Sequence, residues 1–216
     1  MVIQCAATKQ PEAGHLIGED GNPILFVARP DRAPKTKDIL YQRPDDLALD
    51  GRTWRAHLLD YNRRSHNPLG ILPAWQLYRP PVYGELADAF GLENLFILSA
   101  GWGLLAAGFL TPQYDITFTN QADIHKRRSR RDRFADFRMP PDDREQPVVF
   151  LGGRDYVGLF RALTRGSAGK RIVFYNSANA PDVTDCRCVR FKTTTRTNWH
   201  YECARALIDG TLDLPL

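Results

Sequence analysis

The sequence predicts an α/β fold, a single domain in which helices flank a mostly parallel central sheet. Strand, turn and helix follow one another at least three times along the chain, which is the pattern of a largely parallel sheet. The length of 216 residues suits one good-sized domain, and the hydrophobic content of 43% is sufficient for a core. Two polar stretches, at about 10–50 and 120–146, interrupt the pattern, and we interpret them as insertions into that domain.

Short apolar runs mark the expected strands. Continuous rather than alternating apolar residues are typical of strands that are buried on both faces of a sheet. We expect such strands at 2–7, 95–98, 147–153, 170–175 and 189–192. Another apolar patch, at 24–27, is surrounded by Gly, Pro and charged residues and predicts a hairpin or an irregular excursion.

Four segments have the apolar spacing of helices, in which residues three and four apart share a face. They are 52–64, 82–90, 156–163 and 199–208. The first segment carries Arg55, Arg63 and Arg64 beside its apolar face. These arginines either contact a nucleic acid backbone or form an ordinary solvated helix face, and the second interpretation is favoured.

Hydropathy and cysteine spacing exclude several classes of protein. No apolar run approaches the roughly 20 residues of a membrane-spanning helix, and no signal-peptide pattern is present, so we expect a soluble, cytoplasmic protein. Cys186 and Cys188 lack the two-residue spacing of zinc knuckles, and no second pair follows. Reduced thiols are the default, with a metal site or a disulfide as the alternatives; we expect no metal and no cofactor. The sequence does not determine the oligomeric state.

Unusual residues follow four of the expected strands, at 5–9, 99–103, 152–156 and 175–179. Ligands of open α/β sheets bind beyond the carboxyl ends of the strands, so we expect these segments to line one pocket. The hydroxyl-rich segment 193–198 precedes a helix, whose free N–H groups attract anions. Simple capping by Thr197 or Asn198 is the alternative there.

The side chains in and near these segments suit a nucleobase and its phosphates. Aromatic planes stack on a base, while amides and hydroxyls read its edge. Lys9 either holds a phosphate or is an ordinary exposed lysine. We expect Trp102 to lie in the pocket facing the carboxylate of Asp115. The candidates for base or nucleotide binding are Cys5, Lys9, Tyr78, Trp102, Gly103, Tyr114, Asn176, Asn179, Thr195 and Arg196.

Three residues are candidates for catalysis. Asp115 can position water or stabilise positive charge that develops on a sugar. Ser99 contributes a hydroxyl, but it lies outside a G-x-S-x-G motif, which disfavours a serine hydrolase. His200 is a candidate acid, although a histidine within a helix is more often structural. The chain also lacks the P-loop, G-x-G-x-x-G and H-E-x-x-H motifs.

A run of basic residues at 125–131 concentrates positive charge, although the formal net charge of the whole chain is only +4. A local basic stripe attracts phosphates whatever the total charge. The alternative is a solvated surface insertion. The candidates for DNA-backbone contact are Lys126, Arg127, Arg128, Arg130 and Arg131.

Several motifs resemble the YaaA-like superfamily, and they occur in the order expected for it. They are Cys5-Ala-Ala-Thr-Lys9, Pro73-Ala-Trp-Gln-Leu-Tyr78, Ile97-Leu-Ser-Ala-Gly-Trp-Gly-Leu-Leu105, Pro112-Gln-Tyr-Asp115 and Val149-Phe-Leu-Gly-Gly-Arg-Asp-Tyr156. The resemblance implies an α/β fold and DNA binding linked to damage or base modification. The insertion at 10–50 and the basic segment depart from the family pattern.

These observations lead to one preferred function and two alternatives. The preferred function is a DNA N-glycosylase that removes a modified or damaged base. A non-catalytic DNA-binding protein of stress or repair would use the same basic surface. The third interpretation is a hydrolase or transferase that acts on free nucleosides or nucleotides.

Overall fold

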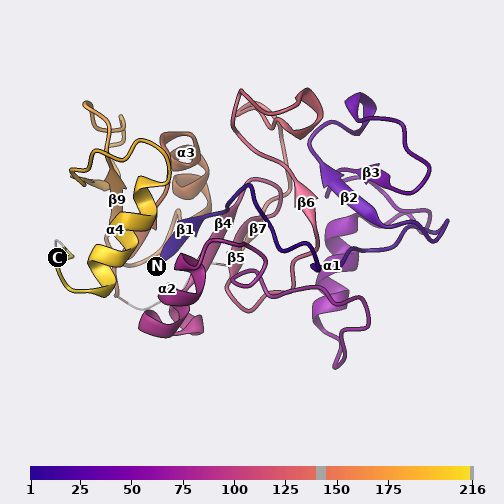
Figure 1. Ribbon diagram of the computed structural model, residues 1–216, viewed down its shortest axis with the longest axis horizontal. Coiled ribbons are helices and arrows are strands. Elements are labelled where there is room, and N and C mark those ends of the chain that lie inside the picture. Colours follow the sequence, from indigo (N-terminus) through magenta and orange to yellow (C-terminus); the bar gives the residue numbers. More distant parts are fainter. Residues whose placement is uncertain (140–144, 215–216) are drawn as a thin grey trace.

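A seven-stranded sheet forms the centre of the protein, and its strands run in the order β10-β9-β8-β1-β4-β5-β7. The computed structural model describes residues 1–139 and 145–214 (Figure 1). The strands of this sheet are β1 (Val2–Gln4), β4 (Phe96–Ser99), β5 (Gly103–Ala106), β7 (Phe137–Arg138), β8 (Val148–Leu151), β9 (Arg171–Tyr175) and β10 (Arg187–Arg190). The α/β fold expected from the sequence is confirmed.

The sheet is parallel except where β4 turns back into β5. β1 lies between two parallel partners, with Ile3 opposite Ile97 of β4 and Leu151 of β8. Every residue of β4 and β8 is buried, so both faces of the sheet are covered at this point. This burial explains why both strands are continuous apolar runs in the sequence.

Four α-helices accompany the strands: α1 (Trp54–Asn62), α2 (Val82–Phe90), α3 (Arg154–Leu163) and α4 (Trp199–Ile208). α1 begins at Thr53, whose side chain accepts a hydrogen bond from the amide of Ala56. α2 and α4 contact each other, α4 packs on β8 and β9, and α3 packs near β4 and β5. None of the helices among the described residues is long and apolar enough to cross a membrane.

A second, three-stranded sheet contains β3 (Leu40–Gln42), β2 (Ile24–Val27) and β6 (Tyr114–Asp115) in that order, beside α1 (Figure 1). The expected hairpin is present where the chain enters β2: Ile17 bridges Pro23 in antiparallel fashion, and the Ile24 amide donates a hydrogen bond of 2.8 Å to the Leu16 carbonyl oxygen. β2 itself pairs in parallel with both neighbours, and its Phe26 is fully buried. The stretch 10–50 is therefore an integral part of the packed structure.

Buried apolar side chains from both sheets form one continuous core. Arg55 of α1 connects the two parts, because its guanidinium donates hydrogen bonds to the carbonyl oxygens of Gly101 (2.7 Å) and Trp102 (3.0 Å). It also pairs with the Asp45 carboxylate. Arg55 is only 4% exposed, which corrects the expectation of a solvated arginine face for this residue.

The polar stretch 120–146 is packed against the rest of the protein over its described part. It contains the short 3-10 helix η3 (Ile124–Lys126) and strand β7, and β7 pairs with β5 at the edge of the large sheet. Residues 140–144 of this expected insertion lie outside the described residues. Residues 120–121, 123–124 and 129–131 are exposed, so a solvated surface describes part of this stretch, whereas β7 is paired with the large sheet.

Candidate functional site

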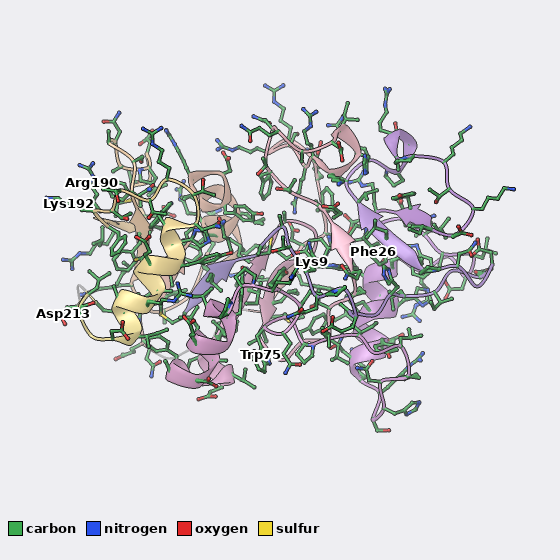
Figure 2. The ribbon with its side chains drawn as sticks, viewed as in Figure 1. Lys9, Phe26, Trp75, Arg190, Lys192 and Asp213 are labelled. Carbon is green, nitrogen blue, oxygen red and sulfur yellow. The ribbon has the colours of Figure 1, made fainter. Side chains whose placement is uncertain are left out.

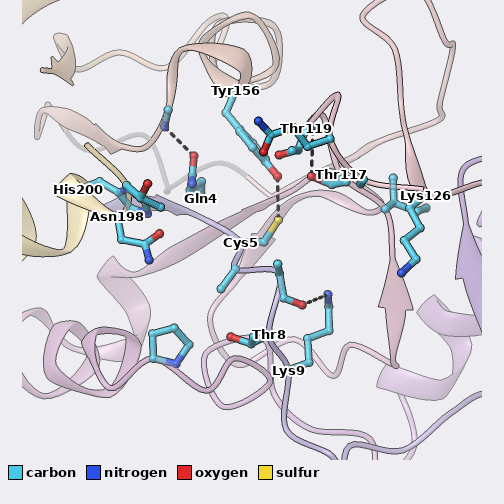
Figure 3. A pocket seen from close by; sticks show the side chains of 18 of the residues that line it. Gln4, Cys5, Thr8, Lys9, Thr117, Thr119, Lys126, Tyr156, Asn198 and His200 are labelled. Atoms are coloured by element: carbon cyan, nitrogen blue, oxygen red, sulfur yellow. Dashed lines mark hydrogen bonds between the residues drawn. The ribbon is translucent and has the colours of Figure 1, made fainter. Parts of the chain in front are cut away.

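A cavity of about 820 Å³ opens at the carboxyl end of β1 (Figure 3). Its wall combines the segment after β1 with residues that follow β6 and β8 and with the start of α4. The residues that matter for its chemistry are Gln4, Cys5, Lys9, Asp115, Thr117, Asp123, Lys126, Gly153, Tyr156, Arg196 and His200. Ligands of open α/β sheets bind at this kind of edge, so the location agrees with the sequence-based expectation.

An ion pair occupies the part of the cavity next to the small sheet. Asp115 ends β6, and its Oδ2 lies 2.9 Å from Nζ of Lys126. Lys126 also contacts the Asp123 carboxylate at 3.0 Å. The hydrogen bond to Asp115 is the largest cause that raises the pKa of Lys126, followed by the bond to Asp123. Lys126 is therefore a permanent cation that fixes the orientation of the Asp115 carboxylate.

Lys9 enters the same cavity from the segment after β1 and lies centrally in the molecule (Figures 2 and 3). Its backbone forms an antiparallel bridge with Tyr78. Its ammonium group lies 4.2 Å from the ring centroid of Tyr114 and donates a long hydrogen bond of 3.4 Å to the carbonyl oxygen of Ala7. Burial lowers the pKa of Lys9, an effect that Cys5 and Asp115 partly offset.

Two hydrogen bonds connect the end of β1 to the segment after β8 in the wall of the cavity (Figure 3). Sγ of Cys5 lies 3.3 Å from the phenol oxygen of Tyr156, and both side chains are largely buried. Oε1 of Gln4 accepts a hydrogen bond of 2.6 Å from the amide of Gly153. Burial raises the pKa of Tyr156 well above its usual range, so the phenol stays uncharged at neutral pH.

The start of α4 forms the opposite wall. Arg196 lines the cavity, as expected, but Thr195 does not. The hydroxyls of Thr193 and Thr195 instead donate hydrogen bonds to the carboxylate of Glu202. Asn198 precedes the helix in the left-handed conformation (φ 58°) and makes no side-chain cap, so the capping alternative is not observed for it.

His200 lines the cavity but is almost fully buried, with 2% exposure. Its Nε2 atom has no hydrogen-bond partner among the described residues. Burial lowers the pKa of His200 to about 4, so the ring is neutral near pH 7. A neutral, buried imidazole argues against the expected role as a general acid.

Trp102 lies in the core and not in the cavity, which corrects the expectation of an exposed stacking surface. The side chain is fully buried. Phe137 of β7 stacks on its ring at a centroid distance of 6.1 Å, and Phe26 of β2 meets it edge-on at 4.9 Å. Trp102 and Asp115 therefore do not face each other across one pocket, because residues from both predicted insertions surround the indole.

The turn between β4 and β5 has a structural role. Oγ of Ser99 is buried and accepts hydrogen bonds from the amides of Gly101 (3.2 Å) and Trp102 (3.0 Å). Gly103 has φ of +95°, and a Cβ atom there would lie 2.5 Å from the carbonyl oxygen of Phe137. The close backbone approach at this glycine is thus made by β7, and neither Ser99 nor Gly103 lines the cavity.

Tyr78 and Tyr114 are buried next to Lys9, outside the cavity lining. They are 3% and 1% exposed, and their phenol oxygens share a hydrogen bond of 2.8 Å. Neither ring lines the cavity, so neither is available to stack on a ligand in this structure. Their link to the site is Lys9, whose ammonium group lies over the Tyr114 ring.

The segment after β9 does not reach the cavity. Nδ2 of Asn176 donates a hydrogen bond of 3.2 Å to the carbonyl oxygen of Thr195, which ties two loops together. Asn179 is exposed, and its carbonyl oxygen accepts a hydrogen bond from the Ser177 hydroxyl. Of the four strand ends expected to meet, those of β1 and β8 line the cavity, whereas those of β4 and β9 do not.

The basic segment does not form one continuous phosphate-binding stripe. Lys126 faces the cavity, and Arg127 is half-buried. Arg128 is 6% exposed and binds the Asp136 carboxylate with both terminal nitrogens, at 2.8 and 2.6 Å, so it is a buried structural residue. Only Arg130 and Arg131 of the five candidates are exposed.

Sequence reasoning missed the ion pair of Lys126 with Asp115 and the role of Gln4. No local spacing in the sequence signals either contact. Asp115 and Lys126 belong to different segments of the chain, and Gln4 meets Gly153 only because β1 and β8 are neighbours in the sheet. Among the described residues, no group of three or more His, Cys, Asp and Glu side chains could hold a metal ion. No family model, curated protein or solved structure matches the chain, so its resemblance to the YaaA-like superfamily stays a prediction.

Proposed function

We propose that the protein hydrolyses the N-glycosidic bond of a nucleotide unit, with a modified or damaged base in DNA as the preferred substrate. The observation that carries this proposal is the Asp115 carboxylate, held at the wall of a cavity by a lysine. Cleavage of an N-glycosidic bond develops positive charge on the sugar. A fixed carboxylate stabilises that charge or orients the attacking water.

The other groups of the cavity suit a phosphorylated sugar. Arg196 lines the wall at the amino end of α4, where free N–H groups and the helix dipole favour an anion. Lys9 and Lys126 also line the cavity, and their positive charges offset the negative charges of Asp115 and Asp123. The cavity volume of about 820 Å³ accommodates a nucleotide unit with water.

Recognition of the base would depend on hydrogen bonds more than on stacking. Trp102 and Tyr78 are buried away from the cavity. The polar side chains that remain at the wall include Thr117, Thr119 and Gln121, which offer hydroxyl and amide groups to the edge of a base.

A second candidate, a hydrolase of free nucleotides, is favoured by the distribution of the basic residues. Arg128 is buried in an ion pair, and Lys126 is occupied by two carboxylates. Arg130, which is 69% exposed, contacts Asp155. Fewer cations are therefore free to follow a DNA backbone than the sequence indicates, whereas the cavity suits a single nucleotide equally well.

The test is base release by wild type and by Asp115→Asn, measured on DNA that carries varied modified bases and on free nucleotides. We expect the variant to lose activity on the order of 100-fold, because the amide cannot stabilise the cationic transition state. Asp185→Asn is the matched control. Asp185 lies outside the cavity, where it pairs with Arg161 and Arg171. Its side chain is 37% exposed, close to the 36% of Asp115, so we expect activity close to wild type.

The outcomes separate the candidate functions. Release from DNA with salt-dependent binding supports the glycosylase, and release from free nucleotides alone supports the second candidate. Salt-dependent DNA binding without release from any substrate would leave a non-catalytic DNA-binding protein. No release of any base by the wild type would exclude the hydrolase proposal.

A further inference from the structure

Two lysines line the cavity, and their surroundings differ in a way that affects their chemistry (Figure 3). Lys126 contacts two carboxylates, those of Asp115 at 2.9 Å and Asp123 at 3.0 Å. Lys9 takes part in none of the ion pairs formed among the described residues. Its ammonium group lies over the face of Tyr114, at 4.2 Å from the ring centroid, and donates a hydrogen bond to the carbonyl oxygen of Ala7.

The protonation of the two amines follows from these contacts. An aromatic face stabilises an ammonium group much less than a hydrogen-bonded carboxylate does in a buried site. Burial accordingly lowers the pKa of Lys9, whereas the two carboxylates raise the pKa of Lys126. Each unit by which a lysine pKa falls gives about tenfold more neutral amine at a pH below it. Lys9 is therefore the better nucleophile of the two.

The backbone around Lys9 is held in place by contacts with the segment that contains Tyr78. The backbone bridge to Tyr78 and a hydrogen bond of 2.9 Å from the Gln10 amide to the Leu77 carbonyl oxygen anchor the segment. The side chain then extends into the cavity that also contains Asp115 and Arg196. A lysine that is held in place without a carboxylate partner, in a cavity where Arg196 can attract a phosphate, is typical of imine-forming sites.

We propose that Lys9 forms an imine with the aldehyde carbon of a sugar phosphate bound in the cavity. The Nζ lone pair adds to the carbonyl carbon, and the π electrons of the C=O bond move to oxygen, which gives a carbinolamine. Loss of the hydroxyl group as water, with protons taken from the amine, leaves the C=N bond. One amine and one aldehyde thus give one imine and one water, without any oxidant or reductant.

This inference deepens the proposed function and rests on it for the origin of the aldehyde. Hydrolysis of an N-glycosidic bond leaves a sugar whose C1 carbon opens to an aldehyde. Lys9 would capture this product in the cavity where Asp115 acts. The step as written uses neither Tyr156 nor Cys5, whose side chains form a hydrogen bond with each other.

The experiment is reductive trapping on the full chain with sodium borohydride. The probes are ribose 5-phosphate and a DNA oligonucleotide with a preformed abasic site, and adducts are detected by intact mass and peptide mapping. We expect an adduct that maps to Lys9 with at least one probe. Lys9→Arg keeps the positive charge but cannot form an imine, so its adduct should be lost. Lys192→Arg, the matched control at an exposed lysine outside the cavity, should retain it.

A second measurement works on the wild type alone and does not depend on the folding of a variant. Limited reductive methylation with formaldehyde should modify Lys9 before Lys126, because only neutral amines react. Absence of an adduct with both probes, an adduct that maps to other lysines, or an adduct that survives in a folded Lys9→Arg would overturn the inference. Methylation of Lys126 before Lys9 would contradict it as well.

The hydrolase proposal and the imine proposal can be tested independently of each other. The probes already carry an aldehyde, so trapping needs no cleavage of an N-glycosidic bond. An adduct at Lys9 without base release from any substrate would exclude the hydrolase proposal and keep the imine. Base release without any adduct would exclude the imine and keep the hydrolase.

Discussion

Arg128 and Arg130 are two residues apart, and their surroundings give them opposite roles. Arg128 binds Asp136 in a pair whose side chains are only 6% and 9% exposed, and it also donates a hydrogen bond of 2.7 Å to the Ala100 carbonyl oxygen. Arg130 and Asp155 are 69% and 60% exposed. The first pair is part of the packed structure, whereas water and salt screen the second.

This difference gives a prediction at the residue scale. Arg128→Ala should lower the free energy of unfolding by about 3–5 kcal/mol, because it removes both short hydrogen bonds to the buried Asp136 carboxylate, which keeps only a 3.9 Å contact with Arg55. Arg130→Ala should change it by less than about 1 kcal/mol. Urea denaturation of the two variants measures both values. Equal losses would show that Arg128 is not a buried structural residue.

Individual residues also explain why the aromatic candidates do not form the site. Trp102 and Tyr78 have the chemistry for stacking on a base, but they are 0% and 3% exposed. Their rings contact other aromatic rings, Trp102 with Phe26 and Phe137, and Tyr78 with Tyr83 at 4.9 Å. A large aromatic side chain stabilises a core by its buried area, and this use competes with ligand binding.

At the scale of elements, the contact between β5 and β7 depends on a residue without a side chain. Gly103 begins β5 with φ of +95°, a conformation that favours glycine. A Cβ atom at this position would lie 2.5 and 2.7 Å from the backbone oxygen and nitrogen of Phe137. Backbone atoms cannot move aside as a flexible side chain does, so a substitution must displace β7.

We therefore predict that Gly103→Ala lowers the free energy of unfolding by at least about 1–3 kcal/mol, the cost of the left-handed conformation alone. The displaced β7 would also uncover one face of Trp102, which should increase its solvent accessibility as measured by fluorescence quenching. Gly108→Ala is the control, because a Cβ atom there meets nothing within 4 Å and its φ is not positive. Equal stability of the two variants would contradict the role of Gly103.

At the scale of the whole molecule, the small sheet and the large sheet share one core, and Arg55 binds the turn between β4 and β5. We therefore treat stability as a property of the complete chain. His200 makes the free energy of unfolding depend on pH, because the residue is 2% exposed and burial lowers its pKa from 6.5 to about 4. The native protein excludes the proton that the unfolded chain accepts below pH 6.5.

The sign of the pH effect follows directly. The contribution of neutral His200 is fully present above pH 6.5 and is lost as the pH falls toward 4, because protons then favour the unfolded chain. We predict that the stability of wild type relative to His200→Phe decreases by roughly 3 kcal/mol between pH 7 and pH 4. Thermal or urea unfolding across this range measures the difference. Parallel pH profiles for the two proteins would show that burial does not lower the pKa of His200 in the native state.

Local pattern in the sequence determined the four α-helices and five strands of the large sheet (β1, β4, β8, β9 and part of β10), but not β5 and β7. The expected helix at 199–208 coincides with α4, and the apolar runs at 95–98 and 147–153 contain most of β4 and all of β8. Apolar runs and helical spacing are properties of neighbouring residues, so they can be read without knowledge of the rest of the chain. The positions of Lys9 after β1 and of Arg196 before α4 follow in the same way.

Only the tertiary structure decided which side chains enter the cavity. Trp102 is buried because Phe26 and Phe137 come from the two stretches that were interpreted as insertions. Lys126 belongs to a basic run, yet it binds Asp115, eleven residues earlier. Such contacts join segments that no local pattern relates, and burial and charge pairing at those contacts set the accessibility and protonation of each side chain.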